Sequence, residues 1–338
     1  MSLRTPLCDI LGVDYPVMLA GMGGVSFANV CAAVSEAGGF GSLGMASKSP
    51  EGIREEMKKV KDLTDKPFGV DLLAAIPESL TRSVEIIIEE GARAFIAGLG
   101  VPGPILKELK DAGVVVISMC GAVRHAVKAE QAGVDIVVAQ GTEAGGHTGP
   151  IGGMALIPQI VEAVNIPVVA AGAINDGRGL AAALAFGAQG VWVGTRFIAS
   201  TEANAHAAYK DRIIGASDRD TTVTRSYSGK TMRVIANEWT RDWEDRQDEI
   251  GNFGSQGQVS VQAGVMRSLM GDTSGFDPAR EAAAAGQGSG GIHDVKPAGD
   301  IVREMVAEAQ ETIGRLGCIA GGNYADTPRK GKAAEVLG

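Results

Sequence analysis

Short apolar runs recur along the first 200 residues of this chain. Several follow a helical stretch that ends in a small residue and a glycine, as where Ala132-Gly133 precedes Val134–Ala139. Glycine just past a helix adopts a left-handed conformation at little cost, and a continuous apolar run after it is typical of a strand covered on both faces. The pattern predicts eight strands: Pro16–Ala20, Gly41–Gly44, Phe68–Leu72, Arg93–Ala97, Val114–Ser118, Val134–Ala139, Pro167–Ala171 and Gly190–Gly194.

Helical stretches separate these runs. They are predicted at Ser26–Ala37, Pro50–Leu63, Glu78–Glu90, Gly103–Asp111, Ala122–Gln131, Ala155–Val164 and Asp176–Phe186. Strict alternation of eight strands with helices indicates an α/β protein with a (β/α)8 TIM barrel. A doubly wound open sheet is the alternative. The barrel is preferred because no Gly-x-Gly-x-x-Gly turn follows the first strand.

The alternation breaks off near Thr201, and the chain stays polar and irregular as far as Gly299. This stretch is too long for a plain loop. We expect it to form a small, mostly helical lid or substrate domain over the barrel mouth, inserted between the eighth strand and the last helix. Apolar residues every four positions within 300–316 predict that helix. The expected division is a cofactor-binding barrel at 1–200 and 300–318, a lid at 201–299 and a loosely ordered tail at 319–338.

Charge and cysteine content narrow the classes of partner. The net charge of −9 argues against a nucleic-acid or anionic-membrane surface, and the sequence shows no Lys/Arg cluster that offsets it. The four cysteines form no metal-ligand spacing, so four reduced thiols and no metal site are expected. The first residues lack an apolar signal region, and no run approaches the roughly 20 apolar residues of a membrane span. These features favour a cytoplasmic protein.

The segment 140–149, Gln-Gly-Thr-Glu-Ala-Gly-Gly-His-Thr-Gly, follows the sixth predicted strand and combines flexible backbone with ionisable groups. A ligand can approach a glycine backbone closely, and a histidine beside it can donate, accept or carry a proton near neutral pH. His147 is therefore the candidate functional centre, although a histidine in a glycine loop can also be a hydrogen-bonded strut. Glu143 is either a base or a cap for backbone amides.

Other strand ends carry groups suited to a flat, phosphorylated ligand. Barrel enzymes bind phosphate between the loops that follow strands seven and eight, where this chain has Gly172, Gly194 and Thr195. The loop with Gly21 and Met22 follows the first strand and lets backbone touch a flat ring. Asp71 and Gln140, at the ends of the third and sixth strands, can hydrogen-bond the edge of a heterocycle. These features suggest flavin mononucleotide (FMN).

These motifs resemble those of the nitronate monooxygenase family, formerly called 2-nitropropane dioxygenases. The resemblance rests on Gln140–Gly149, on Ala171–Gly172 with Asp176–Gly179, and on Gly194–Phe197, and it covers nearly the whole chain. The Glu-Ala-Gly-Gly-His-x-Gly loop is shared with the FMN-dependent enoyl-ACP reductases. The segments Asn204–His206, Tyr209–Lys210, Arg241–Asp242 and Ala285–Gln287 also resemble those reductases.

The resemblance implies FMN without a metal, with His147 as the catalytic histidine. It implies that Gln140, Gly145, Gly172, Gly194 and Thr195 contact FMN, and that Trp192 falls where a glutamine is frequent. Asp71 falls where many members carry a flavin-contacting asparagine. An anion there would disfavour the anionic reduced flavin. Met119, at the end of the fifth strand, leaves a site without the cation that some relatives place there.

The expected activity is oxidation of alkyl nitronates with O2 to a carbonyl compound and nitrite. An NAD(P)H-dependent enoyl-ACP/CoA reductase or quinone reductase is the alternative, so the small-molecule substrate is a nitronate or an enoyl thioester, with NAD(P)H as the reductant in the second case. A non-redox phosphate-binding barrel would need a lysine or paired carboxylates at strand ends, which are missing. His125 is expected to be structural, His206 is a candidate substrate contact, and a homodimer is left open.

Overall fold

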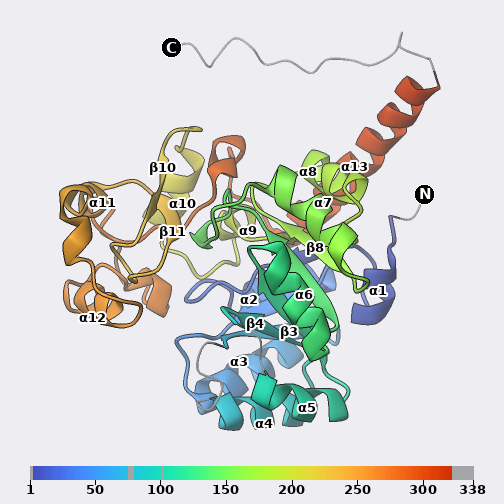
Figure 1. The fold of residues 1–338 in the computed structure, drawn as a ribbon, viewed down its shortest axis with the longest axis horizontal. Coiled ribbons are helices and arrows are strands. Elements are labelled where there is room, and N and C mark those ends of the chain that lie inside the picture. The colour runs from blue at the N-terminus through green and yellow to red at the C-terminus, as the bar shows by residue number, and fades with distance from the viewer. Residues whose placement is uncertain (1–2, 75–79, 101–102, 322–338) are drawn as a thin grey trace.

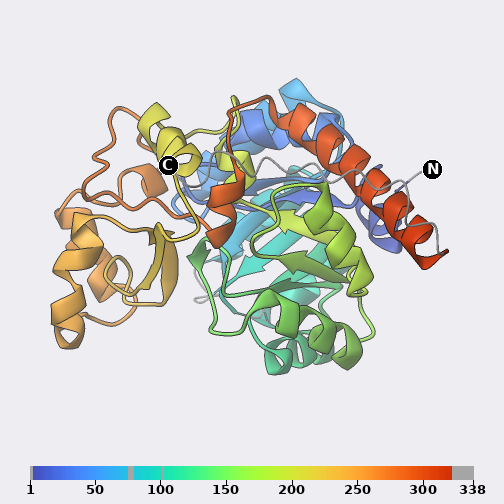
Figure 2. The ribbon, with the colours of Figure 1, turned by 90° about the horizontal axis from the view of Figure 1, so that it is seen from above.

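The computed structural model describes residues 3–74, 80–100 and 103–321. Eight parallel strands form one sheet in the order β1-β9-β8-β6-β5-β4-β3-β2, and a parallel bridge between Met18 and Phe40 joins its two edges. The sheet is thus a barrel wrapped by helices (Figures 1 and 2), which confirms the predicted fold and excludes the open sheet. The strands are β1 (Val17–Leu19), β2 (Gly41–Gly44), β3 (Phe68–Leu73), β4 (Ala94–Gly98), β5 (Val115–Cys120), β6 (Ile136–Gln140), β8 (Val168–Ala171) and β9 (Gly190–Val193).

The helices between these strands bury one face against the barrel. Most predicted boundaries lie within three residues of the observed ones, and Gly133 ends α6 in the expected left-handed conformation. The start of the predicted helix at Glu78 lies outside the described residues. The helices are α2 (Ala28–Glu36), α3 (Pro50–Leu63), α4 (Thr81–Glu89), α5 (Gly103–Asp111), α6 (Val123–Ala132), α7 (Gly153–Ala163) and α8 (Gly177–Ala185), and the short α9 (Thr195–Ile198) follows β9.

The last helix, α13 (Ala298–Ala320), is longer than predicted at both ends and packs against α8 and α2. It therefore completes the ring of helices after the intervening lid. The first two residues of the predicted loose tail, at 319 and 320, belong to this helix. Residues 322–338 lie outside the described part of the chain.

A short helix that the sequence pattern did not reveal closes the N-terminal end of the barrel. In α1 (Pro6–Leu11), Leu7 and Leu11 are fully buried in the cluster of side chains inside the barrel. Arg93, just before β4, donates its guanidinium hydrogens to the carbonyl of Ile10 and so fixes the end of α1. One end of the barrel is plugged, and only the C-terminal end of the strands is left for a ligand.

The lid forms a lobe beside the barrel, coloured yellow to orange in Figures 1 and 2. Short helices make up much of its regular structure, but it also contains an antiparallel sheet that was not predicted. In that sheet β11 (Met232–Ile235) pairs with β10 (Thr221–Thr224) and with β7 (Gly146–His147), which belongs to the glycine loop of the barrel. The helical elements are α10 (Ala207–Ile214), α11 (Glu238–Asp242), η2 (Glu244–Glu249), α12 (Ser255–Gln262), η3 (Ser268–Met270) and η4 (Gln287–Gly291).

The lid segments that resemble the enoyl-ACP reductases join the lid to the barrel. The Asn204 side-chain amide donates to the carbonyl of Gly24 at 2.7 Å, whereas the Tyr209 hydroxyl donates within the lid, to the carbonyl of Ala284 at 2.7 Å. The amide of Gly286 donates to Thr195 Oγ1 at 3.0 Å, and that of Gln287 to the carbonyl of Glu143 at 2.9 Å. Arg241 and Asp242 instead lie in α11, away from these contacts.

Within the described residues, no helix combines the length and apolar character that crossing a membrane requires. All four cysteines are free: Cys8, Cys31 and Cys120 are buried, and Cys318 is exposed.

Candidate active site

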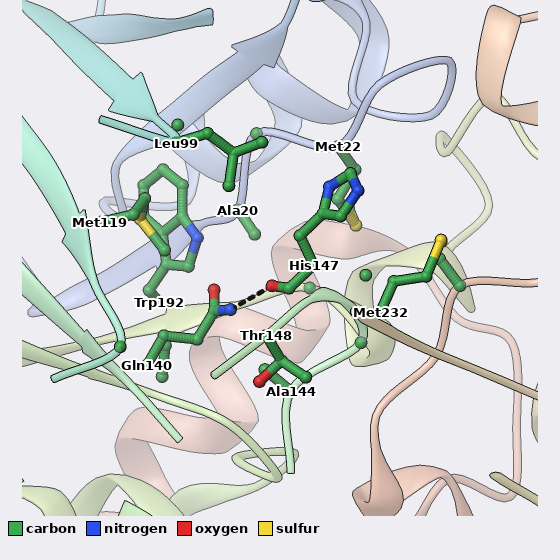
Figure 3. A pocket seen from close by; sticks show the side chains of 18 of the residues that line it. Ala20, Met22, Leu99, Met119, Gln140, Ala144, His147, Thr148, Trp192 and Met232 are labelled. Carbon is green, nitrogen blue, oxygen red and sulfur yellow. Dashed lines mark hydrogen bonds between the residues drawn. The ribbon is translucent and has the colours of Figure 1, made fainter. Parts of the chain in front are cut away.

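A cavity of about 850 Å³ lies where the C-terminal ends of the barrel strands meet the lid. Figure 3 shows part of its lining, with Met119 and Trp192 on one wall and His147 and Met22 across from them. All ten residues predicted from the sequence line this single cavity: Gly21, Met22, Asp71, Gln140, Gly145, His147, Gly172, Trp192, Gly194 and Thr195. The volume lies in the upper part of the range of about 300–1,000 Å³ that is usual for ligand pockets.

His147 is held from three directions. Its backbone pairs with Met232 of the lid through β7, and its carbonyl accepts a 2.6 Å hydrogen bond from Gln140 Nε2, drawn as a dashed line in Figure 3. Its ring nitrogen Nε2 lies 2.8 Å from the hydroxyl of Ser228, and Phe253 meets the ring edge-on at a centroid distance of 5.8 Å. The imidazole is thereby fixed in position at the cavity wall.

The surroundings of His147 keep it neutral. Burial disfavours the imidazolium ion, and the nearby Lys230 ammonium adds repulsion, which together lower the pKa of His147 from 6.5 to about 4. A neutral imidazole carries one N–H donor and one acceptor nitrogen. At neutral pH it is therefore able either to donate a hydrogen bond or to take up a proton.

The direction of the Ser228 hydroxyl is linked to which ring nitrogen of His147 carries the proton. Its hydroxyl lies 3.1 Å from the carbonyl of Lys230, to which it donates, and it accepts from the amide of Lys230 at 3.3 Å. When the Ser228 hydroxyl donates its hydrogen bond to that carbonyl, Nε2 of His147 must donate to the Ser228 oxygen. Nδ1 then has no proton and is the acceptor. If the hydroxyl turns toward Nε2, Nδ1 carries the proton instead. No described residue hydrogen-bonds Nδ1, so that atom is available to a ligand.

The ends of β8 and β9 present open backbone amides to the cavity. Within the described part of the chain, no acceptor bonds the amides of Gly172, Ala173, Gly194 or Thr195, all of which line the cavity. Gly172 and Ala173 have φ angles of 114° and 53°, and for alanine that conformation costs about 1–2 kcal/mol. Strained backbone with unsatisfied amides suits an anion such as phosphate.

The wall formed by the loop after β1 is built from backbone packed against backbone and Asp71. A Cβ on Gly21 would lie 2.2 Å from the Cβ of Asp71, and one on Gly44 would lie 2.4 Å from the backbone of Met22. Both positions therefore require glycine. Burial, with no described cation beside it, raises the pKa of Asp71 well above its ordinary value of 3.8. Burial thus favours the neutral form of the Asp71 carboxyl, which, like an asparagine amide, combines a donor with an acceptor.

Two candidate roles in the sequence analysis are affected by these contacts. Both carboxylate oxygens of Glu143 accept from the amide of Gly153 at 2.9 Å, at the start of α7, so Glu143 is an amide cap and not a free base. His206 accepts from the amide of Ala208 at the start of α10 and stacks on Phe276. It lies outside the cavity lining, so the cavity gives no support to a substrate contact at His206, which stays a prediction.

The sequence analysis missed several residues that the fold brings to the cavity. Ser228 lies 81 residues and Phe253 106 residues after His147 in the chain, and neither carries a local signal. The sequence shows no cluster of basic residues, but the folded chain forms one. Arg124, His125 and Lys128 of α6 line the cavity together with Lys230 of the lid. His125 is exposed at this rim and is not a buried strut. The spacing 124, 125 and 128 just after a strand was the available signal.

Cys120, at the end of β5, also lines the cavity, but burial raises the pKa of its thiol to about 12, so it is not a thiolate nucleophile. Among the described residues, no group of three or more His, Cys, Asp or Glu side chains is arranged to hold a metal ion.

Comparisons with known proteins agree with this geometry. Residues 4–308 match the family model described as nitronate monooxygenase. A probable nitronate monooxygenase of Staphylococcus saprophyticus is 34% identical over 306 residues, covering 77% of this chain and 86% of that protein. A Rhodococcus jostii protein named (3aS,4S,5R,7aS)-5-hydroxy-7a-methyl-1-oxo-octahydro-1H-indene-4-carboxyl-CoA dehydrogenase is 42% identical over 234 residues, which cover 69% of this chain and just 66% of that relative.

Solved structures give the same placement. The structure of FabK from Thermotoga maritima superimposes with a TM-score of 0.85 at 36% identity, covering 94% of this chain and 99% of that one. A nitroalkane oxidase from Streptomyces ansochromogenes has a TM-score of 0.81 at 29% identity, covering 92% and 99%. With the family match over most of the chain, these likenesses establish that the protein belongs to the nitronate monooxygenase family of oxidoreductases.

Proposed function

We propose that this protein is an FMN-dependent oxidoreductase of the nitronate monooxygenase type, which oxidises alkyl nitronates with O2 to a carbonyl compound and nitrite. The observation that carries the proposal is a neutral histidine, with Nδ1 open to a ligand, in the same cavity as a row of unsatisfied backbone amides. The first feature suits proton handling at a substrate, and the second suits a phosphorylated cofactor.

The residues around the cavity fit FMN. The amides of Gly172, Ala173, Gly194 and Thr195 would hold its phosphate. The backbone of Gly21 and Met22, which carries no side chain at Gly21, would contact the face of a flat ring. The carboxyl of Asp71 and the amide of Gln140 would hydrogen-bond the polar edge of that ring. The bound flavin would supply the transfer of electrons between substrate and O2, and the protein would supply position and electrostatics.

His147 would orient the substrate through Nδ1. With the proton on Nδ1, the ring donates a hydrogen bond to a nitro or carbonyl oxygen. With the proton on Nε2, Nδ1 is unprotonated and can accept a proton from the carbon of a neutral nitroalkane. The Ser228 hydroxyl, which has an acceptor of its own in the Lys230 carbonyl, allows both states without moving the ring. The Lys230 ammonium nearby would favour an anionic substrate such as a nitronate.

A second candidate is reduction of an enoyl thioester or a quinone at the expense of NAD(P)H. It is favoured by the basic residues at the cavity rim, which are more numerous than a singly charged nitronate requires. The likeness to a carboxyl-CoA dehydrogenase and to FabK also supports it. The same cofactor cradle and the same histidine would serve this reaction.

Anaerobic mixing distinguishes the two candidates. The purified flavin-containing protein is mixed with propionate 3-nitronate and, separately, with NADH and NADPH, while the flavin absorbance is followed. Loss of oxidised-flavin absorbance with nitronate alone supports the monooxygenase. Rapid bleaching by a nicotinamide, with no response to nitronate, contradicts it and supports the reductase. No response to any of them contradicts both.

Substitution of the histidine tests its role separately. Loss of a general acid or base lowers turnover by about 10²- to 10⁴-fold. His147→Gln is expected to show a loss in that range while its flavin content stays at the wild-type level. His293→Gln, which removes an exposed histidine outside the cavity lining, is the matched control and is expected to keep wild-type turnover. Full turnover in His147→Gln with bound flavin would refute the assignment.

A further inference from the structure

The rim of the cavity carries a group of basic side chains from two separate parts of the chain. Arg124, His125 and Lys128 lie in the first two turns of α6, directly after β5, and Lys230 lies in the lid just before β11. All four line the cavity, and all four are exposed. We call Arg124, Lys128 and Lys230 the cationic rim.

The cationic rim has no acidic counterpart. Among the ion pairs formed by the described residues, none includes Arg124, Lys128 or Lys230, whereas other exposed cations such as Lys107 and Lys110 are paired with carboxylates. The chain has 40 acidic and 31 basic residues, so unpaired cations gathered at one place run against its overall balance. Mutual repulsion makes such a cluster costly for the free protein, and an anionic ligand would relieve that cost.

The three cations lie close enough to act together. Burial lowers the pKa of His125, and repulsion from Arg124, Lys230 and Lys128 lowers it further; burial and then the Lys230 ammonium likewise lower the pKa of His147. The Lys230 ammonium also lies 6.0 Å from the ring centre of Phe253, which in turn meets His147 edge-on. Lys230 therefore connects the outer rim with the site of the proposed reaction.

We propose that the cationic rim is a subsite for the phosphate groups of a nucleotide-linked ligand, whose uncharged reactive end reaches His147. A simple alkyl nitronate near His147 carries one negative charge and would leave Arg124 and Lys128 on the rim unused. A ligand with several phosphates on a long arm satisfies the three cations and reaches the interior at the same time. The inference rests on the second candidate function, the reduction at the expense of NAD(P)H, for the kind of ligand, and on the proposed site for the position of the reactive end.

Two kinds of ligand share this chemistry. Coenzyme A carries a 3′-phosphorylated adenosine diphosphate on a pantetheine arm, and would enter as an acyl thioester. NADPH carries a 2′-phosphorylated adenosine diphosphate joined to nicotinamide. Both place phosphates and a neutral reactive group at opposite ends of one molecule, so the titrations below use both.

The test is calorimetric titration of the flavin-containing protein with coenzyme A, NADPH, NADH and inorganic phosphate. The variants are the double substitution Arg124→Gln/Lys128→Gln and the single substitution Lys230→Gln. The matched control is Lys58→Gln/Lys66→Gln, which removes two exposed lysines that lie outside the cavity lining and the ion pairs of the described residues. Flavin content is measured from the visible absorbance before each titration.

Coenzyme A, NADPH or both are expected to bind, and whichever binds identifies the source of the phosphates. Each cation removed is expected to weaken the binding about tenfold, as for a lost hydrogen bond to a charged group. The control should bind as the wild type does. Flavin content should be unchanged in all variants, and binding should weaken as salt is added.

The inference is overturned if neither coenzyme A nor NADPH binds to the wild type. The inference is equally overturned if the rim variants bind the nucleotide as tightly as the control does. It is also overturned if the rim variants lose flavin while the control keeps it, because the cations would then hold the cofactor. Absence of flavin from the wild-type protein is a different result, which refutes the proposed function and is seen before any nucleotide is added.

Discussion

The neutral state of His147 gives a prediction that can be worked out from the structure. The folded protein lowers the pKa of this imidazole from 6.5 to about 4, mainly through burial and secondly through Lys230. The difference of about 2.5, at about 1.36 kcal/mol per pKa unit, corresponds to about 3 kcal/mol. Because the ring is partly open to the cavity, this figure is an upper bound for the effect on stability.

The sign of the effect follows from proton binding. Between pH 6.5 and pH 4 the unfolded chain takes up a proton on His147 and the folded chain does not, so acidification favours unfolding. Above pH 6.5 His147 is neutral in both states and does not lower the free energy of unfolding. As the pH drops from 6.5 to about 4 the free energy of unfolding falls, and below about pH 4 the loss is complete. His147→Gln has no such proton to bind.

The assay is urea unfolding of the flavin-containing wild type and of His147→Gln at several pH values between 7.5 and 4, with His293→Gln as control. On acidification the wild type and His293→Gln should lose up to about 3 kcal/mol more unfolding free energy than His147→Gln does. An NMR titration of the His147 ring should give a midpoint near 4. Parallel stability curves for the wild type and His147→Gln, or a midpoint near 6.5, would refute the reasoning.

Three further substitutions test individual contacts of the cavity. Ser228→Ala should keep its flavin and lower turnover about two- to tenfold through loss of the hydrogen bond to Nε2, with partial rescue in Ser228→Thr; unchanged turnover would contradict a positioning role. Gly21→Ala should weaken flavin binding, measured by flavin release, because its Cβ would lie 2.2 Å from that of Asp71, whereas Gly257→Ala, with open space around the new Cβ, should bind flavin normally. Asp71→Asn should be more stable to urea than the wild type at pH 7, by a margin that shrinks toward pH 4. Burial raises the pKa of Asp71, so above pH 3.8 the ionised carboxyl is favoured in the unfolded chain over the folded one, which destabilises the wild type. An equal margin at both pH values would argue against a neutral Asp71.

The barrel could be predicted because its signals are local. Each strand is a short apolar run, in several cases after a glycine, and covered strands of this kind keep their pattern whatever the ligand. The residues lining the cavity were accessible for a related reason, since the end of a strand such as Ile136–Gln140 can be located from its apolar run. Topology then brings all strand ends to one mouth.

The lid could not be predicted in the same way because its structure depends on contacts far along the chain. The strand β10 (Thr221–Thr224) is short, polar and half exposed, so it has no apolar alternation to recognise. The strand β7 contains only Gly146 and His147 and exists through its pairing with β11, more than eighty residues away. Ser228, the hydrogen-bond partner of His147, comes from that same region. The sequence therefore predicted His147 but not its hydrogen bond to Ser228.

The cationic rim shows the same limit for charge. A net charge of −9 describes the whole chain, but an electrostatic surface is set by the residues that the fold brings together. Arg124 and Lys128 come from one helix, and Lys230 comes from a lid loop about a hundred residues later. Only the docking of the lid on the barrel makes them neighbours.

The central claim is that the cavity at the C-terminal end of the barrel holds FMN. The most direct measurement is to denature the purified protein, separate the released chromophore by chromatography and compare its amount with that of the protein. The account predicts FMN at about one molecule per chain, with release from a Gly21→Ala variant at lower flavin concentrations than from the wild type. A protein without flavin after attempted FMN loading, or one that carries only FAD, would contradict it.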